Sequence, residues 1–374
     1  MTRIPFIEAR FFDPAETLPQ LETRLHSHLS RLRWKRFEQG VVFDQDAAPD
    51  VDGEARAQDK EASAAEYGAV RAADRNKIYR RAKQLVARRE ASSGLAHLKK
   101  EDREKIEALR GGVRLVQIAS EHRADELAAL LHTEFPWLAP ATEIVWHAMR
   151  RSVRSGAPGL CLPPLLLDGP PGIGKSVWAR RLAEIIETPA MTYEATSENA
   201  SFGIVGSQRA WGQSTPGRLI QTILRNLVGN PVVVVDEIEK AGAAASSKGQ
   251  AFNLAESLLP LLEKATAKSW GCPYYEEKFD MAWVNWVLTS NDWRKLPEPL
   301  LSRCPPIHLR NLTASELQAF VKLQGVKRGL GIASIEAISE TIGYLAAKSA
   351  PQSLRSVLRM IDRAENVEAR PFVH

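Results

Sequence analysis

Residues 164–183 contain a strand pattern, a glycine-rich loop and a helix pattern in direct succession, and this succession constrains the fold more than any other stretch. The apolar run Leu165-Leu166-Leu167 predicts a buried strand of the kind found in parallel sheets. The loop after it matches the phosphate-binding pattern G-x-x-x-x-G-K-S, and its candidate nucleotide-binding residues are Gly169, Pro170, Pro171, Gly172, Ile173, Gly174, Lys175, Ser176 and Val177. Strand, loop and helix in this order predict an α/β fold in which the loop cradles a phosphate group.

The residue types in the loop suit the chemistry of binding a nucleoside triphosphate. Gly172 and Gly174 can adopt backbone angles that direct several N–H groups toward phosphate oxygens. Lys175 supplies a mobile positive charge for the β- and γ-phosphates, and the Ser176 hydroxyl can ligate Mg²⁺. An ordinary turn before a helix would not require all four fixed positions of the pattern, so we predict a nucleoside triphosphate and Mg²⁺ as ligands.

A second apolar strand ends in two acidic residues. The four valines of 232–235 need apolar cover on both faces, as in a parallel sheet sandwiched by helices. Asp236 and Glu237 follow at the carboxyl end, which is where open α/β sheets bind their ligands. We expect Asp236 to help Ser176 hold Mg²⁺, and Glu237 to polarise the attacking water.

Two further polar residues follow later strand and helix patterns. Asn291 follows the strand pattern 283–289, and its amide could bond the γ-phosphate and the attacking water or simply cap the next turn. Arg303 ends the short helix pattern 296–303, and is either a surface charge or a group that reaches the nucleotide of a neighbouring subunit. The apolar segment 136–140 is a candidate wall of an adenine pocket, although a hydrophobic turn would have the same composition.

Helix and loop signals divide the chain into three predicted domains, which span residues 1–115, 116–310 and 311–374. The first is mostly helical, and its segment 71–110 has 13 lysines and arginines against 6 acidic residues. Such a segment can contact nucleic acid, but it is more often a solvated helix face. Its thin apolar stripe suits packing within its own domain better than the docking of a partner.

The third domain has the signals of a helical lid. Thr313 and Glu316 form a capping box at the start of one helix, and Gly329 follows its expected end. Ser353 opens the last helix, with Arg355 in its first turn. We therefore expect a small helical bundle after the α/β domain.

Composition excludes several classes of protein. No apolar stretch approaches membrane-spanning length, and the first residues lack the core of a signal peptide, which predicts a cytoplasmic globular protein without a membrane partner. Cys161, Cys272 and Cys304 lack metal-ligand spacing. We expect them to be buried thiols in a reducing compartment, and assign them no chemistry.

Together these patterns resemble the AAA+ ATPases over about 120–366, and within them the ATPase module of Lon-type proteases. Residues 236–240 are similar to the Asp-Glu-Ile-Asp-Lys of that family, with Glu239 in place of the second Asp. Residues 206–221 are similar to its first pore loop, which ends in Gly-x-x-Pro-Gly-Arg-Ile-Ile-Gln. Further similar segments are 289–291 (sensor 1), 299–303 (arginine finger) and 353–355 (sensor 2).

The resemblance implies that the nucleotide is ATP and that an oligomer hydrolyses it. The residues with implied roles are Lys175 and Ser176 at the phosphates and Mg²⁺, Asp236 at the metal, Glu237 as catalytic base, Asn291 at the attacking water, Arg303 acting across the subunit boundary and Arg355 reporting from the lid. An active site that a neighbour completes requires a homo-oligomer, most simply a ring of six.

The pore loop departs from the family pattern. Trp211 and Gly212 stand where the family has a Tyr-Ile pair, so Trp211 would project into the centre of the ring and contact a substrate polypeptide. The aromatic side chain is kept, and its apolar contact tolerates any sequence, but its aliphatic neighbour is lost. Trp211 as a plain packing residue is the alternative.

The predicted function is an ATP hydrolase that remodels or translocates a protein client. Only 19 residues follow Arg355, too few for the Ser-Lys protease domain of the family, so we do not expect the chain to be a protease itself. A separate peptidase or effector could dock on the ring. The alternatives are a nucleic-acid-associated motor or loader that uses 71–110, and an ATP-dependent assembly switch.

Overall fold

The computed structural model describes residues 2–13, 16–38, 70–196, 202–209, 214–241, 244–245, 251–348, 350 and 352–369. The chain forms two compact units. The sheet unit comprises Met1–Glu8 and Glu104–His374, and the hairpin unit comprises Ala9–Arg103. The boundary between them falls within helix α4 (Lys100–Glu107), so the segment 1–115 contributes residues to both units.

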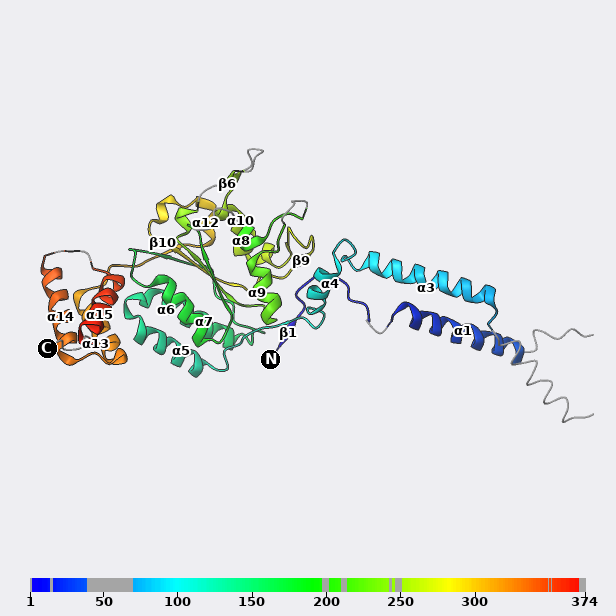
Figure 1. Ribbon diagram of the computed structural model, residues 1–374, viewed down its shortest axis with the longest axis horizontal. Helices are drawn as coiled ribbons and strands as arrows, with labels where there is room; N and C mark the ends of the chain where they lie inside the picture. Colours follow the sequence, from blue (N-terminus) through cyan, green and yellow to red (C-terminus); the bar gives the residue numbers. More distant parts are fainter. Residues whose placement is uncertain are drawn as a thin grey trace, which may run out of the picture. The chain divides into compact units, whose positions relative to one another are not determined.

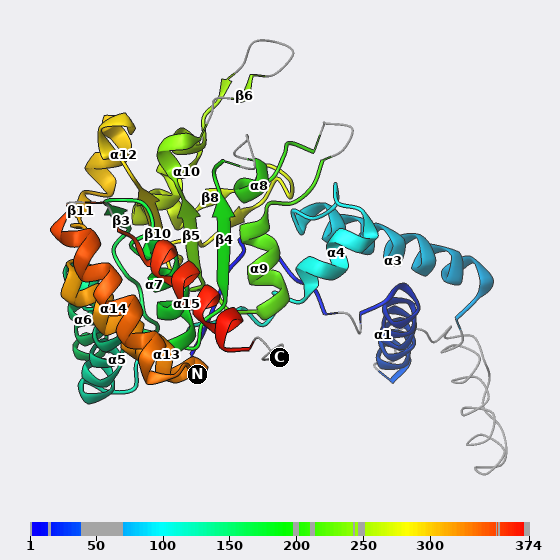
Figure 2. The ribbon, with the colours of Figure 1, turned by 60° about the vertical axis from the view of Figure 1, so that its left-hand side comes forward.

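The sheet unit is built on a sheet of five strands in the order β11-β3-β10-β5-β4, flanked by helices (Figures 1 and 2). Its strands are β3 (Leu165–Asp168), β4 (Ala190–Glu194), β5 (Val232–Asp236), β10 (Asn285–Ser290) and β11 (Pro306–His308). Every neighbouring pair in this sheet is parallel. The predicted α/β fold with a parallel sheet is therefore confirmed.

The central strands are buried on both faces, which explains their continuous apolar runs. Successive side chains of a strand point to opposite faces of the sheet. Alternate residues of the strands belong to one hydrophobic core, and these are Leu165, Leu167, Val232, Val234 and Val287. The residues between them, such as Leu166 and Val233, are equally buried and point to the other face. Apolar cover on both faces is what the four valines of β5 predicted.

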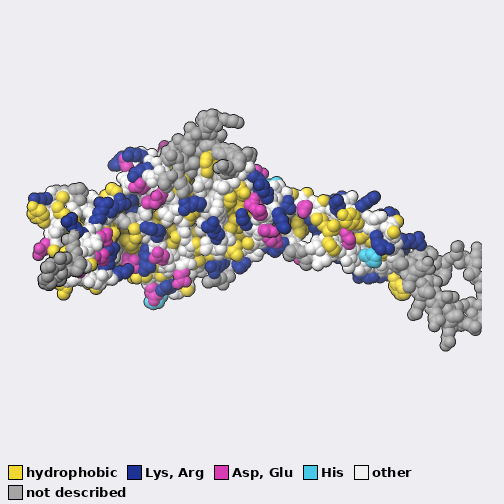
Figure 3. Space-filling model, in the orientation of Figure 1, with side chains coloured by type: hydrophobic (Ala, Val, Ile, Leu, Met, Phe, Trp, Pro, Cys, Tyr) yellow, Lys and Arg dark blue, Asp and Glu magenta, His cyan; other side chains and the backbone are white. Residues whose placement is uncertain are grey.

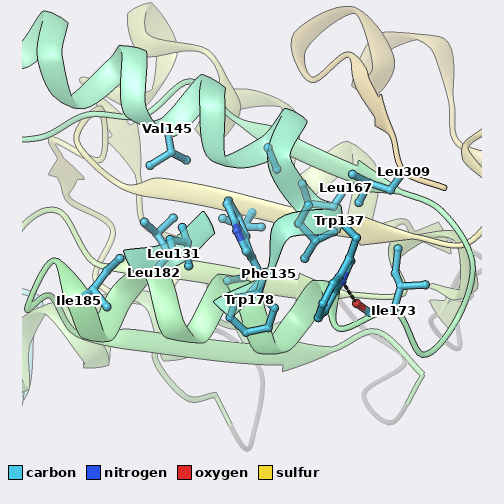
Figure 4. Close-up of a cluster of buried hydrophobic side chains, with 14 of the residues drawn as sticks. Leu131, Phe135, Trp137, Val145, Leu167, Ile173, Trp178, Leu182, Ile185 and Leu309 are labelled. Atoms are coloured by element: carbon cyan, nitrogen blue, oxygen red, sulfur yellow. Dashed lines mark hydrogen bonds between the residues drawn. The ribbon is translucent and has the colours of Figure 1, made fainter. Parts of the chain in front are cut away.

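Three helices share the core on one face of the sheet: α5 (Glu121–Glu134), α6 (Ala139–Arg154) and α7 (Lys175–Ile185). Trp178 of α7 is fully buried, and its Nε1 donates a hydrogen bond to Thr142 Oγ1 at 3.1 Å. Figure 4 shows Trp178 among Leu131, Val145 and Leu182, which come from the three helices. This core holds the first turn of α7, which follows the phosphate loop, in place.

The remaining elements between the phosphate loop and the lid are short. They are α8 (Phe202–Val205), α9 (Arg218–Asn226), η2 (Ile238–Lys240), β6 (Ala244–Ala245), β7 (Ala251–Phe252), α10 (Leu254–Leu262), α11 (Lys264–Ala267), β8 (Trp270–Gly271), β9 (Lys278–Phe279), η3 (Trp293–Lys295) and α12 (Glu298–Arg303). Helix α9 packs against β4, and α12 packs against α10.

The first residues of the chain belong to the sheet unit. Strand β1 (Arg3–Ile4) pairs antiparallel with β2 (Val113–Arg114). Phe6 is fully buried and packs against Phe279, with 5.6 Å between the ring centroids. The N–H of Asp280 donates to the Phe6 carbonyl at 2.9 Å. Backbone pairing with two distant segments therefore ties this short stretch to the sheet unit.

The lid consists of three helices: α13 (Ala314–Arg328), α14 (Ile332–Ala347) and α15 (Leu354–Glu368). The predicted capping box is present, because Thr313 Oγ1 accepts from the N–H of Glu316 and Glu316 Oε2 accepts from the N–H of Thr313. Gly329 ends α13 in the left-handed conformation, with a φ of 75°. Its predicted role as a helix stop is confirmed.

The hairpin unit contains two long helices, α1 (Leu18–Glu38) and α3 (Ala72–Ser92), which pack against each other. Arg33 and Asp74 form an ion pair of 2.7 Å between them. Leu21 and Ala82 are buried. Figure 3 shows hydrophobic side chains between basic ones on the visible face of these helices. Helix α3 thus packs on a helix of its own unit.

None of the helices in the described ranges is long and apolar enough to cross a membrane. Cys272 and Cys304 are buried, and burial raises the pKa of their thiols to about 11 and about 12. Such thiols stay protonated at neutral pH and are poor nucleophiles. Cys161 is half-buried. The expectation of buried thiols is met by two of the three cysteines.

Candidate nucleotide site

A cavity of about 950 Å³ lies between the carboxyl ends of the central strands and the lid. The carboxyl edge of a parallel sheet is where α/β folds bind ligands. The first turn of α7, the tips of β5 and β10 and the helices α13 and α15 contribute to its wall. The residues predicted from the sequence that line it are Pro171, Gly172, Gly174, Lys175, Ser176, Val177, Asp236, Glu237, Asn291 and Arg355.

The phosphate loop has the backbone geometry that its glycines predicted. Gly172 and Gly174 have φ angles of 76° and 92°, in the region that side chains disfavour. A Cβ on Gly172 would lie 2.9 Å from the Cβ of Ser353 in the lid. The N–H of Leu354 donates to the Gly172 carbonyl at 3.0 Å. The first turn of α15 therefore rests directly on the loop.

The segment before α6 supports the loop from the other side. Trp137 is buried, and its Nε1 donates to the carbonyl of Ile173 at 2.8 Å (Figure 4). Phe135 lines the cavity, whereas no residue of 136–140 does. The predicted base-pocket wall at 136–140 is not part of this cavity, because the η1 turn (Pro136–Leu138) places Trp137 and Leu138 in the core.

Lys175 occupies the first turn of α7, with 7% of its surface exposed. Its Nζ donates to the carbonyls of Gly169 and Pro170, at 2.6 and 3.0 Å, and to Asn291 Oδ1 at 2.9 Å. Burial lowers the pKa of Lys175, and nearby carboxylates, Glu239 foremost, act in the opposite direction. The ammonium group thus rests on acceptors that incoming phosphate oxygens could replace.

The Asp236 carboxylate is bonded by two hydroxyl groups. Ser176 Oγ donates to Asp236 Oδ1 at 2.7 Å, and Thr289 Oγ1 donates to the same oxygen. Sequence reasoning missed Thr289. Its place follows from the strand register, which pairs Leu288 with Val235 and so brings Thr289 beside Asp236. That register could not be read from the sequence.

The oxygens of Ser176 and Asp236 fit a magnesium ion. Both are hard oxygen donors, and Mg²⁺ is usually held by one or two protein groups together with substrate phosphates. Among the described residues, no three His, Cys, Asp or Glu side chains form a cluster that could hold a metal by themselves. Phosphate oxygens and water would complete the coordination.

Glu237 and Asn291 meet at the tips of β5 and β10. Asn291 Nδ2 donates to Glu237 Oε1 at 3.2 Å, and Lys240 Nζ donates to Glu237 Oε2 at 2.7 Å. Glu237 has a φ of 51°, an uncommon conformation for a residue with a side chain. Residues with such uncommon backbone conformations are concentrated at functional sites.

The structure does not bring all the predicted residues together. Arg303 is absent from the wall of the cavity, and donates instead to the Pro299 carbonyl at 3.0 Å and to Glu263 Oε2 at 3.2 Å. Trp211 and Gly212 lie outside the described residues. Their predicted contact with a substrate stays a prediction.

The lid contributes cavity residues that sequence reasoning missed. They lie on α13 and are Phe320, Leu323, Gln324 and Lys327. Two more lining residues form an ion pair, Arg181 of α7 with Glu134 of α5 at 2.8 Å. The lid residues follow the ordinary spacing of a helix and carry no motif, so the sequence offered no signal for their role.

Comparison with known proteins points to one family. Residues 165–311 match the AAA family, the ATPase family associated with various cellular activities. The Lon protease of Mycoplasma pneumoniae is 30% identical over 210 residues, which cover 54% of this chain and 26% of the relative. The peroxisomal Lon protease homolog 2 of Oryza sativa subsp. indica is 32% identical over 165 residues, which cover 44% of this chain and 18% of the relative.

The mitochondrial Lon protease homolog of Eremothecium gossypii is 29% identical over 205 residues, which cover 53% of this chain and 19% of the relative. The chain thus matches about a quarter or less of the length of these relatives. The matched part includes the phosphate loop, the acidic strand β5 and the tip of β10. The chain therefore contains a domain that matches the AAA family of ATPases and resembles the ATPase module of Lon proteases.

Proposed function

We propose that the chain binds Mg²⁺ and ATP in this cavity, and uses the free energy of hydrolysis to move or remodel a protein substrate. One observation carries the hydrolytic part: the phosphate loop, the acidic tip of β5 and the polar tip of β10 line a single cavity. Nucleophile, phosphate and general base must meet within hydrogen-bond reach for this reaction, and these elements provide the required groups.

Each group has a distinct task in this proposal. Lys175 contacts the β- and γ-phosphates, while Ser176 and Asp236 hold Mg²⁺, which when bound neutralises phosphate charge. Glu237 accepts a proton from the attacking water, and Asn291 orients that water. Arg355 reaches the nucleotide from the lid, so that lid position depends on the nucleotide bound.

The position of Arg303 supports a homo-oligomer. Its guanidinium bonds to Glu263 and the Pro299 carbonyl and lies outside the cavity of its own chain. In our proposal Arg303 completes the site of a neighbouring subunit, and the simplest closed arrangement is a ring of six. Mass measurement of the ATP-bound Glu237→Gln variant tests this, and a monomer at micromolar concentration would contradict it.

The proposal of a protein substrate rests on the similarity of the chain to Lon proteases. The relatives are named as proteases, so their substrates are polypeptides. The segment 206–221 resembles their pore loop, and in our proposal Trp211 grips a threaded chain through an apolar contact that tolerates any sequence. A separate peptidase or effector could receive the threaded chain.

The experiment measures ATP turnover of the protein alone, with an unfolded polypeptide, and with DNA. We expect the polypeptide to stimulate turnover, and Trp211→Ala to abolish that stimulation while basal turnover remains. Trp34→Ala is the control, because it removes an exposed tryptophan from the hairpin unit. Unchanged stimulation in Trp211→Ala would refute the role of the loop. Stimulation by DNA alone would favour a nucleic-acid motor, and no stimulation by either would favour an assembly switch.

A further inference from the structure

Glu239 lies next to the predicted catalytic groups, in the turn η2 that follows β5. One of its carboxylate oxygens, Oε1, accepts two hydrogen bonds from Asn291. The backbone N–H of Asn291 donates at 3.1 Å and its side-chain Nδ2 at 3.0 Å. A single oxygen of Glu239 therefore fixes both the main chain and the amide of Asn291.

This contact, together with the longer one from Nδ2 to Glu237 Oε1, determines which end of the Asn291 amide faces which neighbour. A carboxylate oxygen can only accept hydrogen bonds, so it selects the NH₂ end of the amide. The carbonyl oxygen Oδ1 then points the other way, and accepts from Lys175 Nζ at 2.9 Å. Glu237 Oε1 accepts from the same Nδ2 at 3.2 Å, but only Glu239 also accepts from the backbone N–H, so Glu239 holds the amide and the main chain of Asn291 together.

The second oxygen of Glu239 makes no comparable contact within the described residues. Oε2 is buried, and no described residue donates a hydrogen bond to it. A buried polar atom without a partner usually destabilises a fold. Glu239 is also the carboxylate that most opposes the lowered pKa of Lys175, so its charge is felt in the cavity. The contacts that place Glu239 are therefore those of Oε1 with Asn291.

We propose that Glu239 is a positioning residue for ATP hydrolysis that acts through Asn291. The proposal rests on the proposed function. When Lys175 moves to the phosphates, Asn291 Oδ1 becomes free to accept one proton of the attacking water, while Glu237 accepts the other. The water oxygen bonds to the γ-phosphorus, its proton passes to Glu237, and the bond from the γ-phosphorus to the bridging oxygen breaks, with the electron pair leaving on ADP.

Two variants separate positioning from charge. Glu239→Met keeps the volume but has no acceptor oxygen, whereas Glu239→Gln keeps an acceptor and removes the charge. We expect Glu239→Met to lower kcat by about 30-fold and to leave KM for ATP within about 2-fold. A misplaced water slows hydrolysis but does not weaken the binding of ATP. Glu239→Gln should lose less than about 5-fold in kcat, since its acceptor can still select the NH₂ end of Asn291.

A double-mutant cycle tests whether Glu239 acts through Asn291. In the Asn291→Ala background, Glu239→Met should change kcat by less than about 2-fold. Glu143→Ala, at an exposed glutamate on α6, is the control and should leave kcat unchanged. An equal loss from Glu239→Met in both backgrounds overturns the proposal, and so does a Glu239→Gln variant as slow as Glu239→Met. If Glu239→Met fails to fold, Glu239→Gln decides alone, and a loss of about 30-fold or more in its kcat would overturn the proposal. Absence of turnover in the unmodified protein would overturn the proposed function instead.

Discussion

The nucleotide cavity and the end of α12 differ in how much of their environment one chain supplies. Around the cavity, Lys175, Ser176, Asp236, Glu237 and Asn291 are joined by hydrogen bonds within a single subunit. At the end of α12, Arg303 is held outside this network by Glu263 and the Pro299 carbonyl.

The bonding of Arg303 is also incomplete. Its Nε is buried, and no described residue accepts a hydrogen bond from it. A guanidinium has five donors, and leaving one buried and unpaired costs free energy. Under the proposed function, this difference means that nucleotide binding is a property of one subunit, while full hydrolysis depends on a second.

Arg303→Ala tests this comparison with the largest expected effect. We expect ATP turnover to fall by about 10³-fold, because an arginine that stabilises the transferred phosphoryl group contributes at least this much. ATP affinity should stay within about 2-fold, since Arg303 does not line the cavity of its own chain. Phosphate release and nucleotide titration measure the two quantities. Arg151→Ala, at an exposed position on α6, is the control.

Mixing subunits distinguishes action in a neighbour from action within the chain. Arg303→Ala and Glu237→Gln subunits are each expected to be inactive alone. In an equal mixture, about a quarter of the sites would combine an intact Glu237 with a neighbour's intact Arg303 and so recover activity. If the mixture stays inactive, Arg303 does not act across a subunit boundary, and the contrast between the two regions fails.

Lys175→Ala tests whether the cavity of a single chain binds the nucleotide. We expect ATP affinity to fall by about 100-fold, because a buried ammonium loses its charge-assisted hydrogen bonds to phosphate. Titration of the isolated subunit with a fluorescent nucleotide measures this. Lys322→Ala, at an exposed position on α13 outside the cavity, should leave affinity unchanged. Affinity that falls by less than about 3-fold in Lys175→Ala would place the phosphates elsewhere.

The local parts of the fold and site could be predicted from the sequence. The loop from Gly169 to Ser176, the acidic end of β5 and the capping box at Thr313 each depend on residues close together in the chain. Such features are set by backbone conformation and by hydrogen bonds over a few residues. Asp236 and Asn291 could be placed because both follow buried strands, which end at the same edge of a parallel sheet.

The remaining parts depend on contacts between distant segments. Thr289 bonds Asp236 only because β10 and β5 pair in one particular register, which their similar apolar runs do not specify. Phe135 lines the cavity while Trp137 does not, and this follows from a short turn that composition alone could not resolve. The α13 residues of the cavity depend on how the lid packs, which no local pattern encodes.

The smallest expected effect concerns the start of α13, the lid helix that lines the cavity. The Arg310 side chain, followed by the capping contacts of Thr313, lowers the pKa of Glu316 to about 2 from its ordinary 4.5. A depressed carboxylate pKa stabilises the fold above the unfolded pKa, and this contribution is lost as the pH falls through about 4.5 toward about 2.

Glu316→Gln should therefore lower the free energy of unfolding at pH 7 by about 1 kcal/mol or less, because solvent screens the exposed Arg310. Urea unfolding between pH 7 and pH 3 measures it, and the difference from the unmodified protein should shrink as the pH falls. A difference that stays constant would contradict the assigned role of the ion pair.

ATP affinity of Glu316→Gln at pH 7 should change by less than about 2-fold, since the cap orders one helix end and does not touch the cavity. An affinity loss comparable with that of Lys175→Ala would instead mean that the cavity is complete only while the start of α13 is ordered.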